Sequence, residues 1–198
     1  MAADLHEMSS MIKIDPEPRN FTAQRAIGSG FQSVLFADLR SVQDVEEAIL
    51  SVRAEPKGKN GAAMNRVANY LYGGGEDFVK YCDDVVIAIM VEKKSLFDHL
   101  EEVLDLDIDM IQFGPMDFAM SVGVWGQPGN PKVIEAQETT IKMALKRDKH
   151  PRIELPSVEN ADKYLQKGVR DFCIGWDIRV VKDFLVQNAS PLRKLLDV

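Results

Sequence analysis

Two acidic residues follow successive apolar segments of this sequence, and together they could bind a divalent metal ion. Glu92 directly follows the longest apolar run of the chain, residues 85–91, and Asp117 lies just after the next expected strand, residues 110–113. The carboxyl ends of neighbouring parallel strands form the ligand face of α/β folds, so both carboxylates are expected at one mouth. Two hard oxygen ligands, with room left for water and a bidentate substrate, suit Mg²⁺ or Mn²⁺.

A purely structural interpretation of this pair stays open. Each carboxylate could cap the start of a helix or form an ion pair with Lys93 or Lys94, which follow Glu92 directly. For either acid considered alone, a structural role would be the preferred interpretation. The metal-site hypothesis is preferred because the two acids occupy matching positions after successive strands.

A Gly-Pro sequence precedes the second acid. Gly114 and Pro115 predict a tight bend, and the backbone N–H groups that follow, at Met116 and Asp117, could bind an anion such as a carboxylate. A bend of this kind is common in ordinary loops, so its weight comes from its position beside Asp117.

Lys13 is the basic residue that stands out, because it lies in the expected strand 11–15 among alternating apolar residues. Its side chain either extends to the rim or faces a functional mouth, and both interpretations remain open. None of the histidines follows a strand, so surface positions are expected for all three, although histidine is the usual general base. They are His6, His99 and His150.

The elements that must position these residues alternate between short β-rich runs and longer segments of helical periodicity, which is typical of parallel sheets. Six strands are predicted, over residues 11–15, 33–37, 84–91, 110–113, 152–155 and 171–175. Helices are predicted over 21–27, 42–52, 96–104, 133–145, 158–166 and 180–196, with caps at Ser41 and Ser157. The stretch 56–80, rich in glycine around Gly73 to Gly75, is expected to be a long loop with some helix. The pattern fits either an open sheet or part of a (β/α)8 barrel.

Bulk composition limits the functional classes. A chain of 198 residues with ordinary apolar content predicts one domain over 1–198. The net charge of −7 disfavours nucleic acids and anionic membranes as partners. The N-terminal segment has no apolar signal region, and the two cysteines are isolated, which together predict a cytoplasmic protein.

The segment from Val85 to Glu135 resembles the HpcH/HpaI aldolase family, metal-dependent pyruvate aldolases related to citrate lyase beta subunits. The resemblance rests on an acid that ends one strand, Glu92, a Gly-Pro-Met-Asp turn that ends the next, and the Gly-Gln-Pro loop at 126–128. Weaker similarity covers residues 11–48, like the family's third and fourth βα units, and 172–177, like its eighth strand.

This resemblance implies a TIM barrel, usually assembled into oligomers through an exchanged C-terminal helix. It implies that Glu92 and Asp117 are metal ligands and that the backbone from Gly114 through Pro115 to Met116 holds the pyruvate carboxylate. Lys13 falls where the family has an arginine that polarises the keto oxygen, and a lysine supplies only a point charge in place of a planar fork.

The resemblance also contains a departure. The family's first two strands, with a histidine base on the second, have no counterpart in the sequence, and residues 1–10 are similar to the end of the helix that leads into the third strand. An N-terminally incomplete barrel with about six βα units is therefore expected.

Three functions are weighed on these grounds. The leading hypothesis is a lyase that uses Mg²⁺ or Mn²⁺ to cleave a 4-hydroxy-2-oxo acid to pyruvate and an aldehyde through an enolate, as a homo-oligomer. The second is a truncated or non-catalytic protein that binds a metal, a 2-oxo acid or a partner subunit without turnover. The third, a lyase for acyl-CoA thioesters, is disfavoured because no basic cluster is placed for the phosphates.

Overall fold

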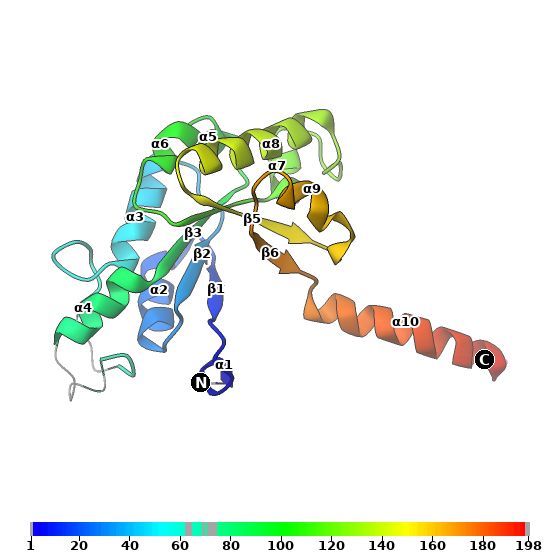
Figure 1. Cartoon of the computed structure of the whole chain (residues 1–198), viewed down its shortest axis with the longest axis horizontal. Helices are drawn as coiled ribbons and strands as arrows, with labels where there is room; N and C mark the ends of the chain where they lie inside the picture. The colour runs from blue at the N-terminus through cyan, green and yellow to red at the C-terminus, as the bar shows by residue number, and fades with distance from the viewer. Residues whose placement is uncertain (1, 62–64, 69, 71–74, 197–198) are drawn as a thin grey trace. The chain divides into compact units, whose positions relative to one another are not determined.

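The computed structural model describes residues 2–61, 65–68, 70 and 75–196 (Figure 1). Within it the chain divides into two compact units, Met1–Pro151 and Arg152–Val198. The single domain expected over 1–198 stays a prediction, and the expected glycine run at Gly73 and Gly74 lies outside the described residues.

The first unit is built on four parallel strands in sequence order. They are β1 (Met11–Ile14), β2 (Ser33–Phe36), β3 (Val86–Val91) and β4 (Met110–Phe113). The register places Lys13 beside Leu35, and Met90 beside Gln112. All four carboxyl ends therefore meet at one edge of this sheet.

Helices connect these strands. They are α1 (Ala2–Leu5), α2 (Arg19–Gly28), α3 (Val42–Val52), α4 (Gly75–Asp84), α5 (Lys94–Phe97), α6 (Leu100–Leu104), α7 (Pro115–Ser121) and α8 (Pro131–Lys146). Figure 1 shows α2 and α3 alongside the strands. The start of α3 is fixed by a capping box, in which the Ser41 hydroxyl accepts from the Asp44 N–H and the Asp44 carboxylate accepts from the Ser41 N–H.

The two faces of this sheet differ in what covers them. Side chains on one face, among them Phe36, Ile89 and Ile111, belong to the large apolar core that also includes residues of the helices. Side chains on the other face form a small separate cluster of Leu35, Ala37, Ala88 and Met90. Because side chains alternate along a strand, Lys13 and Glu92 belong to the second face.

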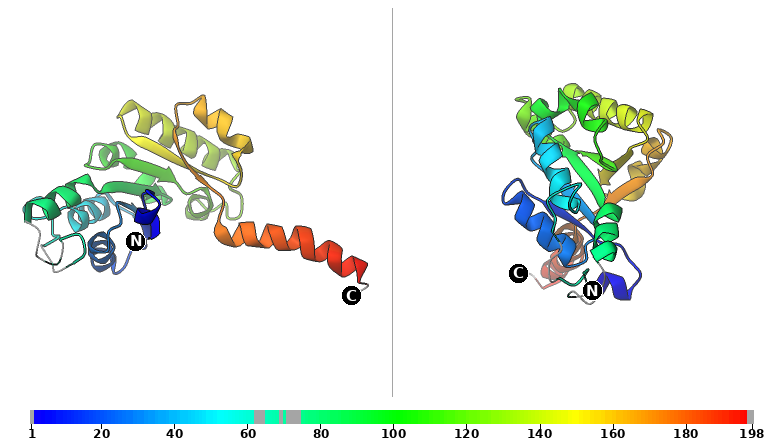
Figure 2. Two further views of the ribbon diagram at one scale, coloured as in Figure 1. Left: turned by 60° about the horizontal axis from the view of Figure 1, so that its bottom comes forward. Right: turned by 90° about the vertical axis from the view of Figure 1, so that its left-hand side faces the viewer.

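The second unit contains two parallel strands, β5 (His150–Leu155, which begins in the first unit) and β6 (Asp171–Ile174), paired from Arg152 with Asp171 to Leu155 with Ile174. The short helices η2 (Val158–Asn160) and α9 (Ala161–Leu165) connect them. The chain continues into α10 (Asp177–Leu195), which runs as one uninterrupted helix in Figure 2. No described helix combines the length and the apolar composition needed to cross a bilayer.

The expected parallel α/β pattern is confirmed, since all six predicted strands are present to within two residues at each end. The helix expected over 96–104 is instead two short helices, α5 and α6. The cap expected from the Ser157 side chain is wrong, because that side chain makes no capping hydrogen bond. Helix α4 begins within the stretch 56–80, where some helix was expected without bounds, and it continues to Asp84. Helix α7 was not predicted, because the Gly-Pro sequence at its start was interpreted as a bend.

A buried arginine fixes the entry into β3. The guanidinium of Arg53 donates through Nη1 to the carbonyl oxygens of Cys82 at 2.9 Å, Val85 at 3.0 Å and Asp83 at 3.2 Å, and through Nε to Asp107 Oδ2 at 3.0 Å. The last carbonyls of a helix lack intrahelical donors, so this side chain satisfies the end of α4 from within the core. The Cys82 thiol beside it is fully buried, and burial raises its pKa to about 11.

Replacing Arg53 by methionine is expected to lower the free energy of unfolding by about 3 kcal/mol, because buried carbonyl groups lose their donor. Urea denaturation measures this change. The matched control is Lys57→Met, which removes an exposed ion pair with Asp83 and is expected to change stability by less than about 1 kcal/mol. Equal effects of the two substitutions would contradict the role given to Arg53.

Candidate active site

Glu92 lies at the carboxyl end of β3 and is 3% exposed. The backbone N–H of Asp38 donates to its Oε1 at 2.7 Å, whereas its Oε2 is buried and has no hydrogen-bond partner within the described part of the chain. Burial raises the pKa of this carboxyl and the negative charge of Asp117 adds to the rise, while the Asp38 hydrogen bond and the charges of Lys13 and Lys93 oppose it. A buried carboxylate oxygen without a donor is a candidate ligand for a cation.

Asp38 follows β2 and has a positive φ of 55°, a conformation that aspartate tolerates better than most residues. Its side chain accepts from Lys93 Nζ at 2.7 Å and from Arg40 at 3.0 Å. Burial alone would raise the pKa of Asp38, but the hydrogen bond and charge of Lys93, with the charge of Arg40, outweigh burial and lower it. The residue therefore holds Glu92 by its backbone and Lys93 by its carboxylate.

Asp117 is in the first turn of α7, and its side chain is 51% exposed. Its Oδ1 lies 3.6 Å from Lys93 Nζ. Lys93 therefore lies between the carboxylates of Asp38 and Asp117, and only 15% of its side chain is exposed. The neighbouring Lys94 instead pairs with Asp98, one turn along the chain.

Gly114 brings the start of α7 against Glu92. A Cβ atom added at Gly114 would lie 2.8 Å from both Cβ and Oε2 of Glu92, so only glycine fits between them. Gly114 is the N-cap of α7 and Pro115 follows in its first turn. The backbone N–H groups of Met116 and Asp117 thus belong to the first turn of a helix, where such groups lack intrahelical acceptors.

Lys13 lies on β1, which pairs with β2, and on the same face of the sheet as Glu92. Its side chain is exposed. Its charge reaches Glu92, where it favours the ionised carboxylate. The structure thus brings Lys13, Glu92, Gly114 and Asp117 to one edge of the sheet, and their roles as metal ligands and substrate-binding groups stay predictions. The histidines are exposed and lie elsewhere, with His99 paired to Glu102.

Asp38 is the site residue that sequence reasoning missed. It follows the strand at 33–36, just as Glu92 and Asp117 follow theirs, so the same strand-end criterion could have selected it. The role of Lys93 was also only half predicted: it was considered as an ion-pair partner for the acids, but its anchoring on Asp38 was not foreseen.

The residues fit a divalent cation, although with few protein ligands. Within the described ranges no group of three or more histidine, cysteine or acidic side chains is arranged for a metal ion. Glu92 Oε2 and the Asp117 carboxylate would supply two oxygens, and water and substrate would complete the coordination that Mg²⁺ or Mn²⁺ prefers. The donor-free Oε2 is the observation that supports this fit.

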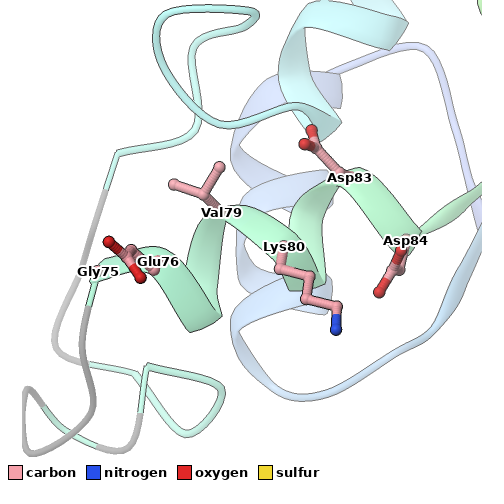
Figure 3. Close-up of a pocket in the computed structure, with 6 residues that line it drawn as sticks. All are labelled: Gly75, Glu76, Val79, Lys80, Asp83 and Asp84. Atoms are coloured by element: carbon pink, nitrogen blue, oxygen red, sulfur yellow. The ribbon is translucent and has the colours of Figure 1, made fainter.

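A cavity of about 610 Å³ lies along α4 and has a different location (Figure 3). It is lined by Gly75, Glu76, Val79, Lys80, Asp83 and Asp84. Since α4 leads into the amino end of β3, this cavity adjoins the opposite end of the strand from Glu92. It contributes no residue to the site.

Comparison with known proteins places the chain among proteins of related sequence. The family model described as HpcH/HpaI aldolase/citrate lyase matches residues 1–183. A 5-keto-4-deoxy-D-glucarate aldolase from Shigella boydii is 24% identical over 172 residues, which cover 86% of this chain and 67% of the relative.

Solved structures share the fold. An HpcH/HpaI aldolase from Desulfitobacterium hafniense matches with a TM-score of 0.85 at 17% identity, over 97% of this chain and 75% of its own. A family protein from Burkholderia cenocepacia gives 0.84 at 22% identity, over 97% and 77%. A macrophomate synthase gives 0.82 at 16% identity, over 98% and 71%. These likenesses support the barrel-type fold, while the expected N-terminal incompleteness stays a prediction.

Gly114→Ala is expected to weaken Mn²⁺ binding at least tenfold, because the added methyl group displaces the Glu92 carboxylate. Titration of Mn²⁺ followed by electron paramagnetic resonance measures the affinity. Gly129→Ala is the matched control, since a Cβ atom there meets nothing within 4 Å. Unchanged affinity in Gly114→Ala would show that the contact with Glu92 does not shape a metal site.

Proposed function

The chain belongs to the HpcH/HpaI aldolase/citrate lyase family, and from this premise we propose that it is a carbon–carbon lyase that cleaves a 4-hydroxy-2-oxo acid to pyruvate and an aldehyde. The observation that carries the proposal is the buried Glu92 Oε2, which lacks a donor among the described residues. Asp117 follows the next strand, β4, and its carboxylate and that of Glu92 together would form a two-carboxylate site for Mg²⁺ or Mn²⁺.

A bound divalent cation would supply Lewis-acid stabilisation of the negative charge that develops on the 2-oxo acid. Glu92 and Asp117 would hold that cation, with Glu92 fixed by the Asp38 N–H. The first-turn N–H groups after Gly114 and Pro115, including that of Met116, would orient the substrate carboxylate. Lys13 would add a positive point charge beside the keto oxygen.

The substrate class follows from the relatives by analogy. The named substrate of the similar aldolases, 5-keto-4-deoxy-D-glucarate, is a 4-hydroxy-2-oxo acid when it is numbered from the carboxylate beside its ketone. We extend only this class to the present chain, because the sequence identity is 24%. We also propose a cytoplasmic location, on the grounds of the acidic composition and the two isolated cysteines.

The test is metal-dependent exchange of the pyruvate methyl protons in heavy water, followed by nuclear magnetic resonance. We expect exchange with Mg²⁺ or Mn²⁺ and at least a hundredfold loss in Glu92→Gln, which keeps the side-chain shape but removes the charge that binds the cation. The matched control is Glu102→Gln, an exposed acid on α6 that pairs with His99.

Exchange at the metal-only rate in the unmodified chain would contradict the enzyme proposal. If Mn²⁺ or pyruvate still bound in a Glu92-dependent manner, the second hypothesis, a binding protein without turnover, would take its place.

We further propose that the protein is a homo-oligomer assembled through α10. None of the helix's described residues is buried, although several are large and apolar. They include Ile178, Val180, Val181, Phe184, Leu185 and Leu192. An exposed apolar surface of this extent is typical of an interface, and the acidic, non-basic composition disfavours a membrane or nucleic acid as its partner.

Phe184→Asp is expected to shift the protein toward smaller species, because it places a charge in the centre of the apolar stripe. Size-exclusion chromatography with light scattering measures the mass. Lys182→Gln, on the same helix, is the matched control and should leave the mass unchanged. A monomeric unmodified protein at micromolar concentration would refute this part of the proposal.

A further inference from the structure

A lysine occupies a position in this site that the proposed chemistry has not used. Lys93 Nζ is 2.7 Å from Asp38 Oδ1 and 3.6 Å from Asp117 Oδ1, and its side chain is largely buried. Its charge also acts on Glu92, the residue before it. One ammonium group therefore offsets part of the charge of Glu92 and Asp117, the carboxylates that would hold a divalent cation.

The lysine is held in this place by a specific anchor. Asp38 forms the shorter contact, and its own conformation is fixed because its backbone N–H donates to Glu92. The next residue, Lys94, has the same charge, but its side chain is 57% exposed and pairs with Asp98 at the end of α5. The orientation of Lys93 is thus a property of the strand-end cluster and not of a lysine-rich surface.

Positive side chains offset most of the negative charge of this cluster. Asp38, Glu92 and Asp117 contribute three negative charges, and Lys93 and Arg40, which both contact Asp38, contribute two positive charges. A divalent cation arriving at Glu92 and Asp117 would meet the repulsion of the Lys93 ammonium across a few ångströms of partly buried space. Repulsion between charges at such separations is large enough to change affinity by an order of magnitude.

We propose that Lys93 competes with the divalent cation for Asp117. In the absence of substrate the protein therefore binds the cation weakly. An anionic 2-oxo acid bound beside the cation offsets the repulsion, and cation and substrate therefore strengthen each other's binding. Because coupling between two ligands is reciprocal, each raises the affinity of the other by the same factor. This inference rests on the proposed metal site.

The experiment is a titration with Mn²⁺ alone and with Mn²⁺ plus pyruvate, followed by electron paramagnetic resonance of free Mn²⁺. In Lys93→Met we expect Mn²⁺ alone to bind about tenfold more tightly than in the unmodified chain, and the strengthening by pyruvate to shrink. Lys94→Met is the matched control, because it removes the same charge one residue away and should change either affinity by less than about twofold.

Three more variants keep the test decisive. Lys93→Arg retains the charge and should retain weak binding of Mn²⁺ alone, and Lys93→Gln replaces Lys93→Met if the latter fails to fold. Glu92→Gln separates the two proposals. Glu92-dependent binding with no tightening in the neutral Lys93 variants would overturn the competition while leaving the metal site intact, whereas no Glu92-dependent binding in any variant would remove both.

Discussion

The hydrogen bond from the Asp38 backbone to Glu92 is the interaction on which the site depends. A carboxylate with 3% exposure is costly to ionise unless donors or cations compensate for the lost water. The protein supplies one donor, and it supplies nearby positive charge from Lys93 and Lys13. Oε2 of Glu92 is left without a donor among the described residues. Oε1 accepts from the N–H of Asp38, whose backbone has a positive φ.

The parallel sheet explains why these groups meet. All of them lie at the ends of parallel strands or just after them, and the side-chain alternation places Lys13 and Glu92 on the face that also carries the small Leu35 and Met90 cluster. The opposite face is occupied by the main apolar core, which packs against the helices. The polar edge is therefore held rigid by an apolar sheet that does not itself take part in the chemistry.

The strands and the acidic pair were predictable because both depend on local sequence patterns. Continuous apolar runs predict buried parallel strands, and Glu92 and Asp117 could be selected from their place after such runs. Helix α7 was missed because its Gly114-Pro115 start is compatible with either a bend or a helix N-terminus. The Asp38 and Lys93 contact joins residues 55 positions apart, and no local pattern specifies which lysine of a Lys-Lys pair turns toward the sheet.

The charge that Lys93 contributes to this cluster affects the stability of the fold as well as the binding of a cation. A site made only of Asp38, Glu92 and Asp117 would repel itself in the absence of a cation, and the strand ends would separate or the carboxyls would remain protonated. With Lys93 in place part of this repulsion is compensated without a ligand, because its ammonium group lies near both Asp38 and Asp117. A divalent cation that binds Glu92 and Asp117 must displace or repel the Lys93 ammonium group. Lys93 would therefore both stabilise the cluster without a cation and lower its affinity for one.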